Sequence, residues 1–487
     1  MKKIIATLLT LAMLLSLAIV ATTNVSAQSE PWDGINYSET FSSGSGTEED
    51  PYIIMNGNDL YKLAVDASMN NLYAGTFFKL GDDINLGGNI WTPIGLSSTN
   101  PFSGNVDGNG KTVYNFSVLN HPAGLFGIIA DNVVKNLKID HAVIQNNSNN
   151  IAGALAGKTM RATVENIEIG ENVLVGNIPM GKKPQTGGLI GLCTDHSTVK
   201  NVIFRGQVEV TIGEGNNWIG GIIGVFGGDS VLDGAINYGK LVYANEEGLE
   251  TDVVSVAGIV GGTGNMDLTG TIKNCINYGA IESSSYASGI IGRTGMTDGL
   301  VVENCFNVST DIKARQTADG ALQAGLILAY GAFSGTFTNC ASVTVENIPT
   351  CGFVTDGVTL GEPDGMRSAA SVDELTFDPA FGAILESVPA AMPTWNEVTP
   401  EEAPEVTETE GTDPEVTEPE GTNPIEDTKP EETDPATPVE TDPVQTPSTD
   451  APGTEKPAEG GCGSVVAGGL AILAVVALAG VALKKRN

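Results

Sequence analysis

The chain has 487 residues, and 24 lysines and arginines against 59 aspartates and glutamates give it a formal net charge of −35. Nucleic-acid binding needs clustered Lys and Arg, so this balance argues against a nucleic-acid partner. The chain also contains 61 glycines, six cysteines and three histidines, and the spacing of the glycines decides the architecture that we expect.

Residues 1–27 have the pattern of an export signal. Two lysines precede an apolar run over residues 4–20, and Val25-Ser26-Ala27 offers a small-residue cleavage site. The run is short and ends in small and polar residues, which argues against a permanent membrane anchor. We expect cleavage after Ala27 and export of the chain that follows.

Residues 28–120 are expected to form an N-terminal cap and the first coils. Asn58 is the expected N-cap of a short helix over residues 59–68, which would cover the open edge of the first coil. Three aspartates of this region are candidate calcium ligands, although turn formation explains each more simply: Asp82, Asp83 and Asp107. No Gly-Gly-x-Gly-x-Asp repeat supports calcium, so we expect no cofactor.

Residues 121–345 repeat a pattern of small, Gly, apolar, apolar, small residues. Successive copies lie 29 to 37 residues apart, and such a period indicates stacked units that cannot bury their apolar faces alone. The glycines that mark the copies are Gly124, Gly153, Gly188, Gly221, Gly258, Gly289 and Gly325. We expect them at corners that need a positive φ or leave no room for a Cβ atom.

Most copies are followed by a short run that alternates apolar and polar residues and carries an Asn, as in Val164-Glu165-Asn166-Ile167. Alternation with a period of two indicates a half-buried strand. Helical repeats need long stretches of helix formers, and propeller blades have a longer period. We therefore predict an all-β parallel β-helix whose coils stack at about 4.8 Å. Residues 231–235 lack the Asn, which leaves the register of that coil open.

The Gly-Leu-apolar-Gly copies resemble the GLUG motif of bacterial surface and adhesin-like proteins. Residues 274–279 and 304–307 are similar to that family's turn between coils, and residues 59–64 with 91–95 are similar to its N-terminal module. The resemblance covers roughly residues 45–395. It implies a right-handed parallel β-helix displayed outside the cell, and it implies little about an activity.

Residues 346–396 are expected to close the last coil as a C-terminal cap. Residues 397–459 then carry 20 acidic residues against two lysines, a net charge of −18, with prolines every few residues. Such a segment cannot bury a core and its charges repel one another. We predict an extended, disordered Pro/Thr/Glu-rich stalk.

Residues 460–487 have the pattern of a C-terminal sorting and transmembrane segment. The uncharged residues 464–483 are long enough to cross the hydrocarbon of a bilayer, about 30 Å, and a basic tail follows them. That tail should stay cytoplasmic and leave the body outside. No Leu-Pro-x-Thr-Gly sequence supports sortase attachment. Cys462 is a candidate site of cleavage or lipidation, and the alternative is a small residue at the membrane face.

Three cysteines follow an Asn at the same place in successive repeats: Cys275, Cys305 and Cys340. They are expected to stack in one column, either as a disulfide or metal site or, more simply, as small buried thiols. Cys193 and Cys351 have no evident partner.

The histidines, His121, His141 and His196, form no His-Glu-x-x-His pair, although some peptidases carry similar Gly-rich repeats. A metallopeptidase therefore has no motif support. The sequence also lacks the Gly-x-Ser-x-Gly motif, so a serine hydrolase has no motif support either.

A polysaccharide lyase or glycosidase on a β-helix is the main enzyme alternative, because such enzymes place carboxylates and a basic residue across neighbouring coils. The candidates are Asp195 with His196, Asp229 with Asp233, and Arg205, although turns and a solvated strand position explain them as well.

Four tyrosines fall in comparable positions between strands: Tyr238, Tyr243, Tyr278 and Tyr286. An exposed column of them could stack on sugar rings, and packing over turns is the alternative.

These patterns predict a cell-surface-displayed, membrane-anchored β-helix that acts in adhesion or in ligand binding, with glycans as one ligand class. Its partners would be the cell envelope and glycans or host surface proteins. No enzyme is expected. The alternatives are the β-helix lyase or glycosidase and a purely structural envelope spacer. The adhesive role leans on a resemblance, which is an associational argument.

Overall fold

The computed structural model describes residues 29–119, 122–146, 151–177, 184–211, 217–244, 254–263, 269–294, 299–316, 322–331, 335–353 and 365–400. All belong to the first of two compact units, Met1–Glu405, and the second, Val406–Asn487, lies outside the described residues. Also outside them are the predicted export signal, most of the predicted stalk, the predicted membrane segment with Cys462, and His121. Within the described ranges, no helix is long and apolar enough to cross a membrane.

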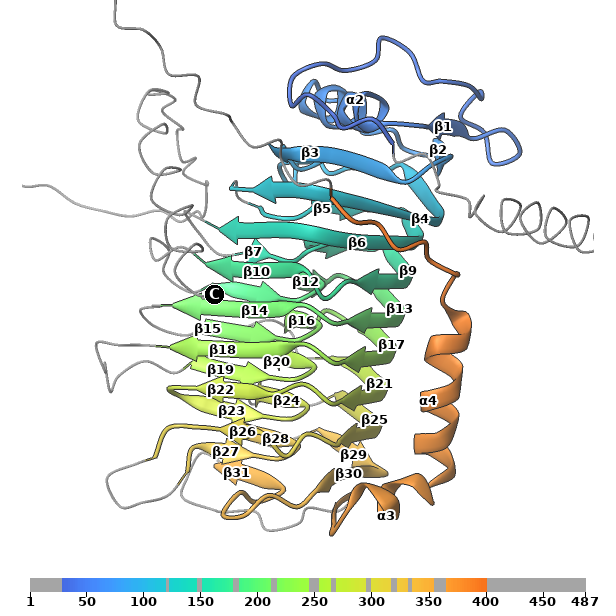
Figure 1. Ribbon diagram of the computed structural model, residues 1–487. Coiled ribbons are helices and arrows are strands. Elements are labelled where there is room, and N and C mark those ends of the chain that lie inside the picture. The colour runs from blue at the N-terminus through green and yellow to red at the C-terminus, as the bar shows by residue number, and fades with distance from the viewer. Residues whose placement is uncertain are drawn as a thin grey trace, which may run out of the picture. The chain divides into compact units, whose positions relative to one another are not determined.

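The described coils form an all-β parallel solenoid with few helices, as predicted (Figure 1). Sheet A, with 18 strands, contains β1 (Tyr52–Ile54), β2 (Phe77–Leu80), β3 (Ile84–Ile90), β4 (Asn105–Val118), β6 (Val133–Asn146), β9 (Thr163–Ile169), β10 (Val173–Asn177), β13 (Thr198–Phe204), β14 (Gln207–Thr211), β17 (Ser230–Asn237), β18 (Lys240–Ala244), β21 (Gly270–Asn277), β22 (Ile281–Ser283), β25 (Leu300–Asn307), β26 (Ile312–Lys313), β29 (Thr336–Thr338), β30 (Cys340–Val343) and β32 (Met366–Ala369). Sheet B, with 8 strands, contains β5 (Phe126–Ala130), β8 (Ala156–Met160), β12 (Ile190–Thr194), β16 (Ile223–Phe226), β20 (Val260–Gly262), β24 (Ile291–Thr294), β28 (Leu328–Gly331) and β31 (Cys351–Phe353). Sheet C, with 6 strands, contains β7 (Ile151–Ala152), β11 (Gln185–Gly187), β15 (Asn217–Gly220), β19 (Val254–Ala257), β23 (Tyr286–Ser288) and β27 (Ala324–Gly325).

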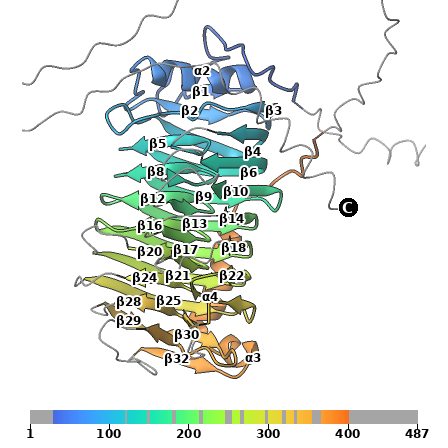
Figure 2. The ribbon, with the colours of Figure 1, turned by 90° about the vertical axis from the view of Figure 1, so that its left-hand side faces the viewer.

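One coil visits the three sheets in a fixed order. From β13 the chain continues to β14 of the same sheet, then to β15 of sheet C and β16 of sheet B, and enters β17 beside β13. Figure 2 shows the strands of sheet B stacked from β5 to β28. The repeat in the sequence is therefore one turn of the solenoid.

The apolar residues of the repeat form one continuous buried column. Leu125, Leu189, Ile222, Ile259 and Ile290 are at most 1% exposed and belong to the same core. Hydrogen bonds join the column from coil to coil, since Leu189 N–H donates to Ile222 O (3.0 Å) and Ile222 N–H donates to Ile259 O (3.1 Å). The expected stacking of equivalent residues is confirmed.

The repeat glycines lie where neighbouring coils approach most closely. None of the seven has a positive φ. A Cβ atom on Gly124 would lie 2.6 Å from Gly153 O in the next coil, and a Cβ on Gly221 would meet Gly258 O in the same way. Contacts this short exclude a side chain, so close approach explains these glycines and backbone conformation does not.

Two repeat glycines lie one position earlier than the sequence pattern suggests. Gly325 pairs with Ser288, not with Gly289. Gly153 faces the carbonyl of Ala156, as Gly325 faces that of Leu328, so the two share one environment. Glycine alone cannot distinguish these adjacent positions, because both approach backbone.

An asparagine column marks the outer face of sheet A. Its members all have φ near +50° and donate their side-chain amides to the preceding coil: Asn136, Asn166, Asn201, Asn274, Asn304 and Asn339. Asn tolerates this left-handed conformation better than most residues. In the coil that lacks the Asn, Gly234 (φ +78°) takes its place and Asp233 Oδ1 accepts the amide of Asn274 (2.6 Å). The register of that coil is thereby fixed.

A helix, α2 (Gly57–Ser68), covers the first coil, close to the expected range. The N-cap is Asn56, not Asn58, because Asn56 has extended backbone and its Oδ1 accepts from Asp59 N–H (3.0 Å). Asp59 is 2% exposed and accepts from Ser38 and Ser42 hydroxyls, both at 2.6 Å. This carboxylate ties the N-terminal segment to the helix.

Two C-terminal helices follow the last coil, α3 (Val372–Thr376) and α4 (Pro379–Ala391). Helix α4 runs back along the outside of the coils (Figure 1). Its Phe381, Ile384 and Val388 pack on an outward-facing apolar row: Ile203, Ile236, Ile276, Phe306 and Ala341. In the coil before Ile203, the paired position is occupied by the charged residue Glu168, so the apolar row stops there. Helix α4, which packs on this row, ends at Ala391.

We predict opposite effects for two glycine substitutions. Gly221→Ala forces a Cβ against a neighbouring carbonyl and should lower stability by about 2–3 kcal/mol. Gly382→Ala, in α4 with nothing within 4 Å of its Cβ position, should raise stability by about 0.5–1 kcal/mol. Thermal and urea unfolding midpoints of the purified chain measure both effects. Equal shifts would mean that the coils are not in close contact at Gly221.

Asn304 tests the asparagine column. Asn304→Ala loses both amide contacts and places a Cβ at φ +50°, whereas Asn304→Gly loses only the contacts. The Asn304→Ala variant should therefore have a free energy of unfolding about 1 kcal/mol lower than that of the Asn304→Gly variant. Urea unfolding compares the two variants, and an alanine variant as stable as the glycine variant would contradict the left-handed geometry.

Candidate binding surface

One outer corner of the coils carries stacked tyrosines. Tyr238 and Tyr278 follow β17 and β21, and their ring centroids lie 5.0 Å apart with planes at 11°. One coil earlier, Arg205 Cζ lies 4.8 Å from the centroid of the Tyr238 ring. Tyr238 is 38% exposed. We call Arg205, Tyr238 and Tyr278 the tyrosine strip.

A buried asparagine ladder holds the tyrosine strip in place. Asn237 donates its amide to Asn277 Oδ1 (2.8 Å), and Asn277 donates to Asn307 Oδ1 (2.9 Å). The Oδ1 atom of Asn237 accepts from Gly239 N–H (2.9 Å), and the Oδ1 atom of Asn277 accepts from Gly279 N–H (3.1 Å). Each tyrosine therefore lies in a tight turn between a fixed Asn and a Gly, which gives the strip a preorganised geometry.

Charged groups border the strip toward the first coils. Arg205 Nε lies 3.4 Å from Glu168 Oε1, and Lys138 Nζ lies 3.7 Å from the same oxygen. Lys138 also lies 3.6 Å from Asp140 Oδ2, and His141 Nδ1 lies 3.5 Å from Asp140 Oδ1. These charged groups are largely buried and pair with one another, so Arg205, with 40% of its side chain exposed, is the accessible charge of the strip.

The four tyrosines proposed as one column divide into three environments. Tyr238 and Tyr278 stack, but Tyr243 on β18 points into the core and is 2% exposed. Tyr286 on β23 of sheet C lies against Tyr330 of β28, with centroids 4.9 Å apart. Tyr330 does not share the sequence position of the other tyrosines. It reaches Tyr286 only because the next coil, which carries β28, stacks on the coil of β23.

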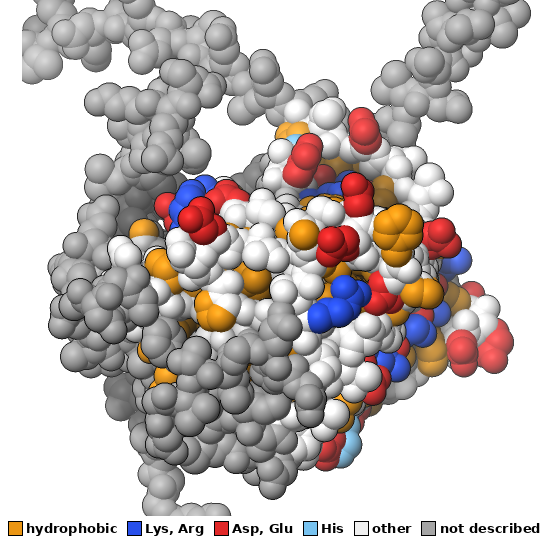
Figure 3. Space-filling view, turned by 90° about the horizontal axis from the view of Figure 1, so that it is seen from below, with side chains coloured by type: hydrophobic (Ala, Val, Ile, Leu, Met, Phe, Trp, Pro, Cys, Tyr) orange, Lys and Arg blue, Asp and Glu red, His pale blue; other side chains and the backbone are white. Residues whose placement is uncertain are grey.

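The outer face of sheet A carries a column of alternating charge. Paired positions in successive coils are Asp107, Lys135, Glu165, Lys200, Asp233, Lys273 and Glu303. Lys200 Nζ lies 3.0 Å from Glu165 Oε1, and Lys273 Nζ lies 3.3 Å from Asp233 Oδ2. Opposite charges alternate because like charges directly opposite each other destabilise a sheet. Seen from the last coil, acidic and basic side chains are likewise interspersed (Figure 3).

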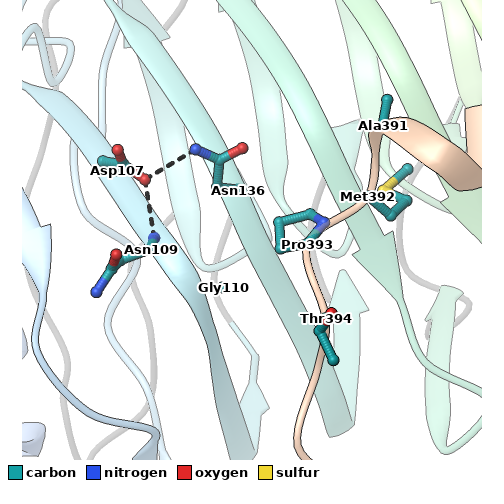
Figure 4. Close-up of a pocket in the computed structure, with 8 residues that line it drawn as sticks. All are labelled: Asp107, Asn109, Gly110, Asn136, Ala391, Met392, Pro393 and Thr394. Atoms are coloured by element: carbon teal, nitrogen blue, oxygen red, sulfur yellow. Dashed lines mark hydrogen bonds between the residues drawn. The ribbon is translucent and has the colours of Figure 1, made fainter.

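A pocket of about 370 Å³ lies between the first coils and the segment after α4. Asp107 Oδ1 accepts from Asn109 N–H (2.8 Å) and from Asn136 Nδ2 (3.0 Å), while Pro393 and Thr394 form the opposite wall (Figure 4). The carboxylate is thus already engaged by the chain itself.

The other candidate calcium ligands also have partners within the chain. Asp82 Oδ1 accepts from Asp83 N–H (2.8 Å), and Asp83 Oδ1 accepts from Thr112 N–H (2.8 Å). Asp83 Oδ2 lies 3.5 Å from Asn396 Nδ2. Among the described residues, no group of three or more His, Cys, Asp or Glu side chains could hold a metal ion.

The corner between sheets B and A carries several of the candidate lyase residues. Arg161 Nε lies 2.7 Å from Asp131 Oδ1, and its Nη1 also pairs with Asp195. His196 lies between two carboxylates, with Nδ1 3.8 Å from Asp195 and Nε2 3.7 Å from Asp229. All five residues have φ between 49° and 63°. The hydrogen bond from Arg161 holds the pKa of Asp131 below its usual value.

The remaining lyase candidates lie elsewhere. Asp233 belongs to the alternating charge column and pairs with Lys273. Arg205 belongs to the tyrosine strip and pairs with Glu168. The proposed pair of Asp229 with Asp233 is therefore divided between a corner turn and a sheet face.

The described cysteines are all buried and free: Cys193, Cys275, Cys305, Cys340 and Cys351. Cys275 pairs with Cys305 in register, and their thiols donate to the carbonyls of Lys273 (3.2 Å) and Glu303 (3.3 Å). Burial is the main cause that raises the pKa of Cys305, and it raises the pKa of Cys193 to about 11. All five are thiols in a core, and the raised pKa leaves Cys193 and Cys305 with little thiolate near neutral pH.

Two curated relatives match parts of the chain. Halomucin from Haloquadratum walsbyi is 30% identical over 179 residues, which are 34% of this chain and 2% of that protein. A protein from Evansella cellulosilytica named as a Gly-rich membrane protein is 33% identical over 144 residues, which are 27% of this chain and 16% of that protein. The chain thus spans a small part of either relative. No family model matches it, so the resemblance to the GLUG motif stays a prediction.

Solved structures with a similar chain path carry protease names. One, named as an immunoglobulin A1 protease from Bacteroides ovatus, has a TM-score of 0.38 at 20% identity and covers 69% of this chain and 89% of its own. Another, named IgA1 Protease, has a TM-score of 0.48 at 13% identity, and the match covers 71% of this chain and 25% of that chain. Because proteases are enzymes, these names contradict the expectation that the chain is not an enzyme, and we withdraw it. At such TM-scores the likeness gives no argument for a particular reaction.

The described cysteines should react with a thiol reagent only after unfolding. All five are buried from the reagent, and at pH 8 the raised pKa values of Cys193, Cys305 and Cys351 leave these thiols almost without thiolate. Ellman's reagent on a Cys462→Ser chain, with and without guanidinium, measures this. Rapid reaction of the native chain, or missing thiols after unfolding, would contradict five buried free thiols.

Proposed function

We propose that the chain is a surface-displayed β-solenoid that binds ligands, with glycans as the main class, and so serves adhesion. The observation that carries the proposal is the tyrosine strip, in which Arg205, Tyr238 and Tyr278 line one outer corner of consecutive coils. Aromatic rings with a cation beside them offer apolar contact and hydrogen bonds at low entropic cost, which is the chemistry of many recognition surfaces.

The placement of the strip supports binding. Its turns are fixed by the buried asparagine ladder, so little conformational entropy is lost when a ligand is ordered on it. Arg205, whose side chain is 40% exposed, offers hydrogen-bond donors for hydroxyl groups beside the rings. Display outside the cell rests on the predicted export signal, acidic stalk and C-terminal membrane segment. The cell envelope would then be one partner, and glycans or host surface proteins the other.

The two earlier alternatives have less support. At the corner that carries candidate lyase residues, the charged groups already pair with one another, since Arg161 is held by Asp131 and Asp195. A purely structural spacer would not need exposed tyrosines, and it predicts no ligand.

A glycan array probed with the purified full-length chain tests the proposal. Tyr238→Ala combined with Tyr278→Ala should weaken binding of the best glycan about tenfold or more, because two central aromatic contacts are lost. Tyr37→Ala is the matched control, since Tyr37 is 48% exposed and contacts Tyr61 in the N-terminal cap. No glycan binding above background, or equal loss in the control, would refute the role of the strip.

A further inference from the structure

A second group of aromatic and cationic residues lies where sheets B and C meet. The rings of Tyr286 (β23) and Tyr330 (β28) lie 4.9 Å apart at 50°. Arg293 on β24 stands over Tyr330, with its Cζ 5.3 Å from the ring centroid. All three side chains are half-buried. Of these three residues only Tyr286 was a candidate from the sequence, because the group is assembled from three strands in two coils.

Arg315 adds a second guanidinium to the group. The backbone N–H of Arg315 donates to the backbone oxygen of Ser285 (3.1 Å), which places residue 315 next to the strand of Tyr286. Burial, and then Tyr330, raise the pKa of Tyr286, whereas the charges of Arg315 and Arg293 lower it. Both guanidinium groups therefore act on the same phenol.

Gln323 supplies an unsatisfied acceptor. It is 7% exposed, and its Oε1 is buried without a hydrogen-bond partner among the described residues. It lies next to the group, since its N–H donates to Arg315 O (2.9 Å) and its O accepts from Ala287 N–H (3.0 Å). A buried acceptor without a donor is costly, so a donor supplied by a ligand would be stabilising.

The pairing of Arg315 differs from that of other arginines in these coils. Arg161, Arg205 and Arg367 each face an Asp or Glu within ion-pair distance. Within the described ranges, Arg315 makes no ion pair with a carboxylate. In a chain of net charge −35, a cation that acts on Tyr286 and forms no ion pair within the described ranges is available to an external anion.

We propose that Tyr286, Tyr330, Arg293, Arg315 and Gln323 form a binding site for an anionic sugar, one that carries a carboxylate or a sulfate group. A guanidinium presents parallel N–H donors that match such an anion in a bidentate manner. The tyrosine rings supply apolar contact for the sugar ring, and Gln323 Oε1 accepts from a sugar hydroxyl. This site deepens the proposed function, and it is separate from the tyrosine strip.

Calorimetric titration of the purified full-length chain tests the site with three probes: tetragalacturonate for carboxylates, a heparin-derived tetrasaccharide for sulfates, and maltotetraose as the neutral control. We expect saturable binding of one or both anionic probes and affinity for the neutral probe that is about tenfold lower or less. The net negative charge of the chain works against non-specific attraction of anions, and the charge-matched Lys313 control below tests for it.

Arg315→Gln should lower the affinity for the anionic probe about tenfold or more. The matched control is Lys313→Gln, which removes the same charge two residues away, from a side chain that is 63% exposed and pairs with Asp311 at 3.5 Å. The control should change affinity less than about twofold. Arg293→Gln repeats the test if the first variant fails to keep the unfolding midpoint of the parent chain.

Two outcomes overturn the proposal. One is no saturable binding of either anionic probe, and the other is equal loss in the Arg315 and Lys313 variants. The chain with Tyr238→Ala and Tyr278→Ala should bind the anionic probe as the parent does. If the tyrosine-strip variants keep full glycan binding on the array while this site binds its anionic probe, the result refutes the role of the strip and leaves this site supported.

Discussion

The structure depends on how closely the backbone of one coil lies against the next. At the turn between sheets C and B, the carbonyl oxygen of one coil occupies the space that a side chain of its neighbour would need, as at Gly124 and Gly221. Only glycine permits this approach. Because the approach fixes the register, the apolar residues that follow each glycine stack into a single buried column, and each coil buries the face that it could not bury alone.

Once the register is fixed, the outer surface becomes a set of columns with their own chemistry. Charges alternate along one column, so that Lys200 stands between Glu165 and Asp233. Asparagine amides donate from coil to coil along two others. Tyr238 and Tyr278 stack because they occupy the same position in adjacent coils. A binding surface on such a scaffold is rigid and repetitive, which suits an extended ligand such as a glycan chain.

The sequence was sufficient to predict the parallel stacking of the coils, and it was insufficient for the site. Period, alternation and small residues predict the stacked coils, since each signal lies within one repeat. The shift of Gly153 and Gly325 could not be predicted, because glycine fits both adjacent positions. Tyr243 could have been excluded from the surface by the alternation along residues 240–244, which points it inward. Tyr330 and Arg315 could not have been assigned to Tyr286, because only the stacking of separate coils brings them together. Nor does the sequence reveal that α4 covers the outer row of Ile203, because that row resembles ordinary strand residues.

Spin-label distances along the alternating charge column test the central claim most directly. Labels at Lys135 and Glu303 should lie five coils apart, about 24 Å, and labels at Lys135 and Thr338 six coils apart, about 29 Å, given a spacing of about 4.8 Å. Cysteine labels in a Cys462→Ser chain suffice, because the described native thiols are buried. An increase of about one strand spacing for those 35 further residues supports stacked coils in this register. A separation that does not grow in such steps would contradict the architecture and the surfaces built on it.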